Sequence, residues 1–256
     1  IFGKSLKKRA SAITANANEN PIPLMQKGVK LKNVVFNYPN RRETRVTIDS
    51  LTIEKGKKYA VIGASGSGKT TFLDLIIGLI PLEKGQMTVD GVEVDDQNIS
   101  QWRNQIAYVP QTLFLASGSV LDNICASPSD QILERKKLKD AVHFASFDFV
   151  LENDKLDETK LNLDLGENAK RLSGGQRIRL AIVKAIYQGQ RVLVFDEATG
   201  ALDRETAQRI VRNITKLSED YTVVFATHSH EGLELFDKVI TIENQFIMSK
   251  QSVMQN

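Results

Sequence analysis

The sequence of 256 residues contains one cysteine, one tryptophan and six prolines, and it has no long apolar run. Because Cys125 is the sole cysteine, an internal disulfide is excluded, which fits a reducing compartment. A membrane-spanning helix needs about 18 consecutive apolar residues. The longest candidate, Phe72–Leu82, is shorter and contains Asp74, so it is better interpreted as a buried helix of a globular domain.

A strong excess of charge is also absent. The net charge is +3 at pH 7, and charged residues make up 25% of the chain. This even balance gives no electrostatic reason to expect nucleic acid, and we expect no nucleic-acid partner. With 41% hydrophobic residues, a chain of this length can bury a sizeable core.

The first part of the chain lacks a regular pattern. The polar run Asn16–Asn20 leads into Pro21 and Pro23, which is typical of a linker. No secretory signal is recognisable, and the chain begins at Ile1 and not at a methionine, so we expect a piece of a longer protein. The predicted parts are a linker over 1–27, a domain over 28–248 and a C-terminal tail over 249–256.

The pattern inside the domain indicates an α/β fold. Two short runs of apolar, mostly β-branched residues, Val192–Phe195 and Thr222–Ala226, are typical of central strands in a parallel sheet. The segment Arg204–Leu217 between them predicts a crossover helix. A hairpin is predicted around the turn Asp90–Gly91, whereas apolar residues recur at helical spacing later in the chain. We therefore predict a β-rich flank and a helical insertion over about 112–187.

The string Gly63–Thr70 fits the pattern Gly, four residues, Gly-Lys-Thr, between a predicted strand and a predicted helix. Glycines let backbone N–H groups wrap around phosphate oxygens, and the helix N-terminus adds partial positive charge. Lys69 is expected to reach the β- and γ-phosphates, and the Thr70 hydroxyl to bind Mg²⁺. The residues predicted to hold the nucleotide here are Gly63, Ser65, Gly66, Ser67, Gly68, Lys69, Thr70 and Thr71.

The apolar run Val192–Phe195 ends in two carboxylates. A carboxylate at this point suits a site for Mg²⁺ and nucleotide, because the metal takes oxygen ligands and bridges phosphates. Asp196 is therefore predicted to bind the metal. Glu197 is predicted to act as the general base for the attacking water.

The string Leu172-Ser173-Gly174-Gly175-Gln176 precedes a predicted helix that begins near Arg177. A serine hydroxyl and open backbone N–H groups at a helix start offer a second anion site. The plainer interpretation is a capped helix start after a glycine turn. However, the five-residue string arises by chance in fewer than about 1 in 1,000 chains of this length.

With these motifs, residues 29–243 resemble the nucleotide-binding domains of ABC transporters. The resemblance implies a P-loop NTPase core with a mostly parallel central sheet, an antiparallel β subdomain and an inserted α-helical subdomain. It also implies ATP and Mg²⁺ as cofactors and ATP hydrolysis as the reaction.

The resemblance assigns roles to further positions. Tyr38 matches an aromatic residue that stacks on adenine, and Gln111 matches a glutamine that senses Mg²⁺ and the attacking water. His228 directly follows an apolar strand and matches the histidine that contacts the γ-phosphate. The positions implied to meet the ATP held by a partner subunit, or to cross between subunits, are Ser173, Gly174, Gly175, Gln176 and Asp203.

The implied partners are a transmembrane domain, in the same or a separate chain, and a second nucleotide-binding domain, identical or different. The implied location is the cytoplasmic face of a membrane. Gly166-Glu167 resembles a segment of exporter-type domains, so we expect an exporter. A free-standing importer ATPase subunit and a non-transport ABC ATPase remain alternatives, and the cargo is not encoded in these residues.

Three departures from the family pattern are present. Gly200 stands where a serine is common, Lys184 where an arginine is frequent, and Lys170-Arg171 where a small residue is typical. None removes a group predicted to carry chemistry. They bear on communication between the two sites of a dimer.

Overall fold

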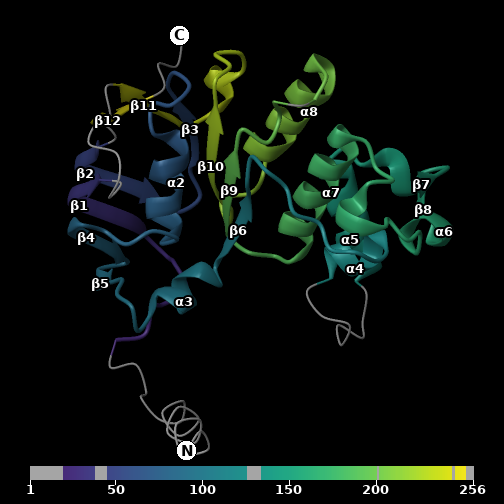
Figure 1. Ribbon diagram of the computed structural model, residues 1–256, viewed down its shortest axis with the longest axis horizontal. Coiled ribbons are helices and arrows are strands. Elements are labelled where there is room, and N and C mark those ends of the chain that lie inside the picture. The colour runs from purple at the N-terminus through teal and green to yellow at the C-terminus, as the bar shows by residue number, and fades with distance from the viewer. Residues whose placement is uncertain (1–19, 38–44, 126–133, 201, 244–245, 252–256) are drawn as a thin grey trace, which may run out of the picture.

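The computed structural model describes residues 20–37, 45–125, 134–200, 202–243 and 246–251 (Figure 1). Strands occupy one side of the molecule in this view and a group of helices the other. Among the described residues, no helix has both the length and the apolar character required to cross a membrane.

The described strands of the main part form one sheet in the order β5-β4-β1-β2-β12-β11-β3-β10-β9-β6. Their bounds are β1 Gly28–Asn37, β2 Arg45–Glu54, β3 Lys58–Ile62, β4 Lys84–Val89, β5 Val92–Glu93, β6 Ile106–Val109, β9 Val192–Asp196, β10 Thr222–Thr227, β11 Lys238–Glu243 and β12 Phe246–Gln251.

The sheet has a parallel part and an antiparallel part. Strands β11, β3, β10, β9 and β6 run parallel to one another. In contrast, β1 pairs antiparallel with both β2 and β4, and β12 pairs antiparallel with β11. The two parts meet where β12 pairs with β2 at Phe246 and Thr47. The predicted fold class, a mostly parallel core with an antiparallel β subdomain, is confirmed.

The central strands are buried on both faces. Every residue of β9 and β10 is buried, as expected for a parallel sheet covered by helices. In β9, Leu193 and Phe195 belong to the core shared with the later helices, while Val192 and Val194 belong to the core that contains α2 (Lys69–Ile77). Helices therefore pack against β9 from both faces of the sheet.

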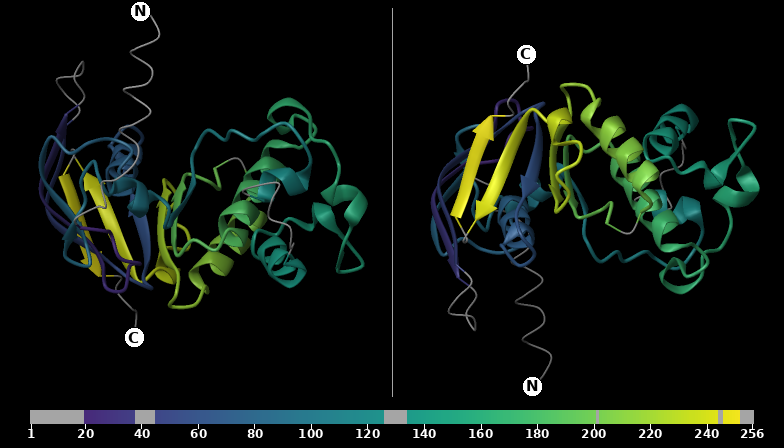
Figure 2. Two further views of the ribbon diagram at one scale, coloured as in Figure 1. Left: turned by 90° about the horizontal axis from the view of Figure 1, so that it is seen from below. Right: turned by 90° about the horizontal axis from the view of Figure 1, so that it is seen from above.

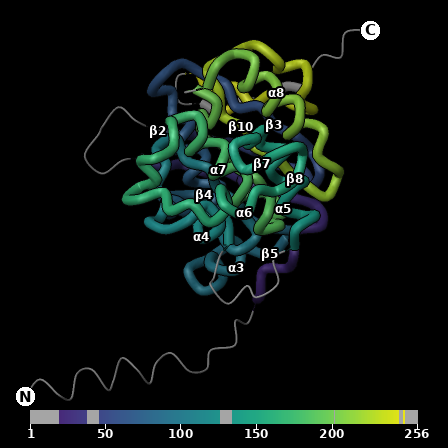
Figure 3. The backbone as a smooth tube through the Cα atoms, turned by 90° about the vertical axis from the view of Figure 1, so that its right-hand side faces the viewer, coloured from purple at the N-terminus to yellow at the C-terminus, as the bar shows by residue number. Residues whose placement is uncertain are grey.

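The inserted helical subdomain lies apart from the antiparallel strands, on the far side of the parallel ones in both views of Figure 2. Its helices are α4 Val120–Ile124, α5 Arg135–Phe144, α6 Glu158–Leu161 and α7 Gly174–Tyr187. A small hairpin, β7 (Leu151–Glu152) and β8 (Lys155–Leu156), also belongs to it and was not predicted; Figure 3 shows this part facing the viewer. The other helices are α3 (Ile99–Arg103) and the predicted crossover helix α8 (Arg204–Thr215), with a 3-10 turn, η3, at Leu233–Leu235.

Residues 20–28 are hydrogen-bonded to the domain. The backbone N–H groups of Gln26, Lys27 and Gly28 donate to the carboxylate of Asp90 at 2.6, 2.8 and 2.8 Å. The N–H of Ile22 donates to Oε1 of Gln101, a residue of helix α3, at 2.8 Å. β12 ends at Gln251, inside the predicted tail. The division of the chain into linker, domain and tail stays a prediction.

Asp90 provides a stability test of this connection. Burial raises its pKa, but the three N–H donors outweigh burial and hold the pKa of this carboxyl below its ordinary value. Its stabilising effect is therefore present above pH 3.8 and lost as the pH falls through the lowered folded pKa. Asp90 also has φ 52°, which asparagine tolerates better than alanine.

We expect Asp90→Ala to lower the free energy of unfolding at pH 7 by about 3 kcal/mol, because three charge-assisted bonds are lost and alanine is strained at this φ. Asp90→Asn, which keeps one acceptor oxygen, should cost about 1 kcal/mol. Urea unfolding measures both, with the exposed Asp96→Ala as control. Equal effects of Asp90→Ala and Asp96→Ala would contradict the connection.

Candidate active site

The predicted site residues gather where the parallel strands end. Lys69 and Thr70 follow β3 through the glycine loop, Asp196 ends β9, His228 follows β10, and Gln111 follows β6. In a sheet of this type the loops beyond the carboxyl ends of the strands form one crevice. The topology therefore brings together residues that are far apart in the sequence, such as Thr70 and Asp196 at 126 positions, as the ion pair and hydrogen bonds below confirm.

The glycine loop is shaped for close backbone approach. A Cβ atom at Gly63 would lie 2.5 Å from Ser67 Oγ and 2.7 Å from the backbone oxygen of Ile242, so a side chain there would collide. Gly68 has φ 106° and caps α2 without a side-chain hydrogen bond. The first N–H groups of α2 have no acceptor within the helix, and such groups attract anions.

Lys69 lies inside this loop with only 5% of its surface exposed. Its ammonium donates to the backbone oxygens of Gly63 at 3.0 Å and Ala64 at 3.1 Å. It also lies 3.3 Å from Glu197 Oε1. The lysine is thus held at the mouth of the loop, beside the carboxylate predicted to act as base.

Thr70 and Asp196 contact each other directly. The Thr70 hydroxyl donates to Asp196 Oδ2 at 2.8 Å. Asp196 is 1% exposed, and its other oxygen, Oδ1, is buried without a hydrogen-bond partner. Burial raises the pKa of the Asp196 carboxyl, the neighbouring Glu197 raises it further, and the Thr70 hydrogen bond opposes both.

The Thr70 hydroxyl and the Asp196 carboxylate are the oxygens that could bind Mg²⁺ at this site. A buried carboxylate oxygen without a partner costs free energy unless a donor or cation satisfies it. Among the described residues no group of three or more His, Cys, Asp or Glu side chains could hold a metal. Two hard oxygen ligands beside a phosphate loop nevertheless match Mg²⁺, which usually keeps several waters and takes other oxygens from phosphates.

Three side chains converge on Glu197. Besides Lys69, the Gln111 amide donates to Glu197 Oε2 at 3.1 Å, and His228 Nδ1 lies 3.9 Å from the same oxygen. Glu197 has φ 49°, a conformation that is uncommon outside glycine. Such backbone conformations cluster at functional sites, where the surrounding structure holds them.

Comparison with known proteins decides the family. The model of the family described as ABC transporter matches residues 46–200, more than half of the chain. The chain belongs to the ABC transporter family.

Individual relatives extend the match. The ATP-dependent lipid A-core flippase of Pasteurella multocida (strain Pm70) is 35% identical over 224 residues, and that of Escherichia coli (strain K12) is 33% identical over 223 residues. The matches cover 88% and 87% of this chain but 38% of each flippase, so the chain spans well under half the length of these relatives. A solved structure, a bacterial Atm1-family ABC exporter with ATP bound, superposes with a TM-score of 0.79 at 24% identity over 93% of this chain and 41% of that one.

The ABC signature string begins helix α7. Ser173 caps the helix by accepting from the N–H of Gln176 at 3.2 Å, and the Gln176 side chain accepts from the N–H of Ser173 at 2.8 Å. Ser173 and Gly174 are exposed. Gly175 faces Leu202, since a Cβ on Gly175 would lie 3.1 Å from that side chain. The hydrogen bonds of the signature are therefore local, apart from the cluster around Glu197.

Of the other predicted site residues, the structure describes Asp203 and Thr71 but not Tyr38. Asp203 caps α8 by accepting from the N–H of Thr206 at 2.9 Å, which lowers the pKa of its carboxyl. The Thr71 side chain is buried. Tyr38 lies outside the described residues, so its predicted contact with adenine stays a prediction.

Two residues beside the site were missed. Burial raises the pKa of Asp74, and the charge of Asp196 adds to the effect. Burial likewise raises the pKa of Tyr108, with Asp196 and Asp74 contributing. Asp74 stands four residues after Thr70 and therefore on the same face of α2. This spacing is the signal that could have found it.

Asp196 yields a prediction about stability and ligand. Because its folded pKa is raised, the protonated carboxyl contributes its full stability below pH 3.8, and this contribution is lost as the pH rises through the raised pKa. Burial opposes ionisation of this carboxyl at pH 7, so Asp196→Asn should leave the ligand-free chain at least as stable as the parent. The parent should gain about 2.7 kcal/mol from Mg-ATP at 100 times Kd, and the variant should lose this gain.

Thermal unfolding with and without Mg-ATP measures both effects. The exposed Asp220→Asn serves as the matched control and should keep the full gain. A variant at 196 that is stabilised by Mg-ATP as strongly as the parent would show that Asp196 does not hold the metal.

Proposed function

We propose that this ABC transporter domain is the ATP-hydrolysing motor of an exporter. Two such domains would close around two Mg-ATP and drive an attached transmembrane domain at the cytoplasmic face of a membrane. The observation that carries the proposal is the convergence of Lys69, Gln111 and His228 on Glu197, beside the pair Thr70–Asp196.

Thr70 and Asp196 are the residues that would hold Mg²⁺. Bound there, the metal would neutralise charge on the phosphate oxygens and orient the γ-phosphate. The unpartnered Oδ1 of Asp196 supports this assignment. Gln111 follows β6 at the same edge of the sheet, where its amide contacts Glu197 and so reaches the space next to the metal ligands.

Glu197 suits the role of general base. Its carboxylate is held at the end of β9 by backbone geometry and by the Gln111 amide, so one oxygen has a fixed direction. The water it would orient gives its proton to this carboxylate while attacking the γ-phosphate. His228 lies on the other side of the same oxygen and would contact the γ-phosphate. Lys69 would stabilise the charge that develops on the phosphate oxygens.

The exposed signature supports a two-copy arrangement. Ser173 and Gly174 at the start of the 14-residue helix α7 face solvent, although helix starts of this kind attract phosphate. In a head-to-tail pair, the Ser173 hydroxyl and the N–H groups of Gly174, Gly175 and Gln176 would reach the ATP held by Lys69 of the other copy. Asp203, at the start of α8, would cross between the copies.

An exposed surface next to Gln111 supports docking of a membrane-embedded partner. Phe114, three residues after Gln111, is 88% exposed. The N–H of Leu115 donates to the side chain of Asn168 at 3.2 Å, which ties this segment to Gly166-Glu167. A partner that docked on this segment would cover the Phe114 ring and remove its apolar surface from water. Movement of a partner here would reach Gln111 directly.

The exporter assignment draws on the relatives. Both flippases are named as ATP-dependent, and the superposed structure is an exporter. From the names of the flippases alone, we infer that the transported substrate is a membrane lipid. The alternatives, an importer subunit and a non-transport ABC ATPase, have no observation in their favour.

Glu197→Gln tests the proposed chemistry. We expect kcat for ATP hydrolysis to fall at least 100-fold, because the amide cannot accept the proton of the attacking water. ATP binding should persist, and ATP should favour a dimer that light scattering detects. The exposed Glu152→Gln, in the hairpin of the helical subdomain, removes no proposed base and should keep most of the turnover. Turnover of the position-197 variant within about threefold of the parent would contradict the catalytic role.

A further inference from the structure

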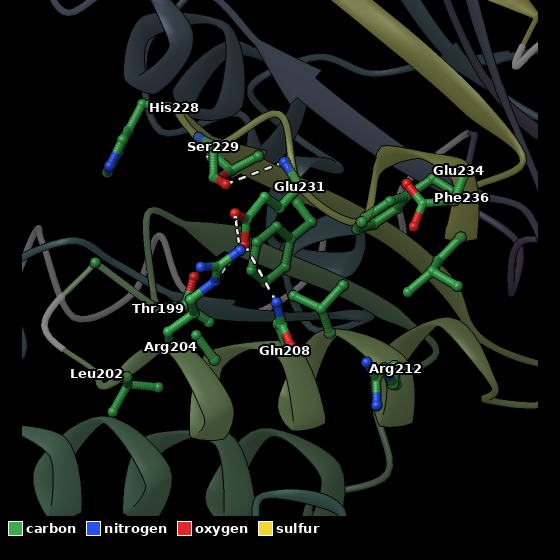
Figure 4. A pocket seen from close by; sticks show the side chains of 17 residues that line it. Thr199, Leu202, Arg204, Gln208, Arg212, His228, Ser229, Glu231, Glu234 and Phe236 are labelled. Carbon is green, nitrogen blue, oxygen red and sulfur yellow. Dashed lines mark hydrogen bonds and ion pairs between the residues drawn. The ribbon is translucent and has the colours of Figure 1, made fainter.

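A fork of hydrogen bonds connects the start of α8 to the loop that follows His228. Arg204 donates through both Nε and Nη2 to the two oxygens of Glu231, with Nε at 3.1 Å from Oε2. Gln208, one turn further along α8, donates to the same Oε2 at 3.2 Å. In Figure 4, Arg204 and Gln208 extend from the helix to Glu231 on the loop, and His228 lies towards the other end of that loop.

Both ends of this fork lie close in sequence to residues of the proposed mechanism. Arg204 directly follows Asp203, which caps α8 and would cross to the second copy. Glu231 stands three residues after His228. The loop between them is braced internally, because the N–H of Ser229 donates to Thr227 Oγ1 and the N–H of Glu231 donates to Ser229 Oγ. A shift of Glu231 would therefore carry Ser229 and its neighbour His228 with it.

Side-chain packing holds the far end of this loop, where Phe236 is buried and Leu233 packs against the core. Between the loop and α8 lies a cavity of about 290 Å³, with walls that include Val211, Phe225 and Phe236. No residue of η3 is buried, and Leu235 is 40% exposed. Gly200 lies close to His228, because a Cβ atom at Gly200 would be 3.9 Å from the His228 ring. As a glycine, it offers no side chain that could connect the segment before α8 to the His228 loop. The fork is thus the main polar connection across a gap.

The fork is exposed, which limits its effect on overall stability. The side chains of Arg204 and Glu231 are 77% and 51% exposed, and exposed ion pairs contribute little to stability. A bidentate arginine–carboxylate pair nevertheless fixes geometry as well as energy. Its effect should therefore appear in the position of the loop and not in the unfolding temperature.

We propose that Glu231 is a positioning residue for ATP hydrolysis. Held by Arg204 and Gln208, it keeps the His228 loop at a fixed place relative to Asp203, so that the γ-phosphate contact and the inter-subunit contact move together. This inference rests on the proposed roles of His228 and Asp203. It assigns to Arg204, Gln208 and Glu231 a part in the reaction that neither the signature nor the phosphate loop supplies.

The test is a charge-swap experiment in the protein expressed from its complete gene. Glu231→Arg and Arg204→Glu should each lower kcat about fivefold and leave KM for ATP within twofold, because binding groups are untouched. The double variant restores opposite charges, and Gln208 can turn its amide oxygen towards the new arginine. We expect the double variant to recover at least half of the parent kcat.

Arg209 and Asp148 provide the matched control. Arg209 of α8 and Asp148, in the 3-10 turn Asp148–Val150, form a similarly exposed pair with 3.6 Å between Nη2 and Oδ2, and this pair links α8 to the helical subdomain and not to Glu231. Single and swapped variants of this pair should keep the parent kcat. In addition, amide exchange of residues 227–236 should speed up in Glu231→Arg and return to the parent rate in the double variant.

Two results would overturn the proposal. One is single variants at 204 and 231 with parent kcat and parent amide exchange. The other is a double variant that folds with the parent unfolding midpoint and does not recover kcat. Glu197→Gln, measured alongside, separates these results from failure of the proposed function, since its turnover reports on the catalytic assignment without involving the fork.

Discussion

The hydrogen bond from the Thr70 hydroxyl to Asp196 joins the first turn of α2 to the end of β9, and the rest of the site depends on it. It holds the phosphate loop against a strand that is buried along its whole length. Because β9 lies between β10 and β6, the loops that carry His228 and Gln111 are fixed on either side of the same carboxylates. A buried aspartate with one unpartnered oxygen costs stability. In the proposed mechanism this cost is offset when Asp196 holds Mg²⁺ next to the phosphates.

Much of this arrangement could be predicted from local patterns. The glycine loop, the acidic strand end and the signature are contiguous strings, and each has a backbone geometry that its residues require, such as Gly63 against Ser67. The strands around Val192–Phe195 and Thr222–Ala226 were predicted because a run that is apolar on both faces fits a covered parallel sheet. Their order then brings residues from four segments to one edge, as the contacts of Glu197 confirm.

The parts that were not predicted depend on contacts distant in sequence. Strand β12 was missed because Phe246–Gln251 is short and partly polar, and its place follows from pairing with β11 and β2. The fork between Arg204 and Glu231 joins residues 27 positions apart, and each alone resembles an ordinary surface charge. The helix over 174–187 begins three residues before the predicted start, because the capping box of Ser173 and Gln176 includes the glycines in the helix.

The central claim is that each ATP is held by Lys69 of one copy and Ser173 of the other, and a mixing experiment tests it most directly. Chains with Lys69→Ala and chains with Ser173→Ala should each hydrolyse ATP at least tenfold more slowly than the parent. Mixed in equal amounts, half of the dimers should contain one chain of each kind and one intact site, so about a quarter of the parent activity should return if the sites act independently. Activity of the mixture no higher than the average of the two variants alone, with both chains folded and dimers exchanging, would contradict a site shared between two copies.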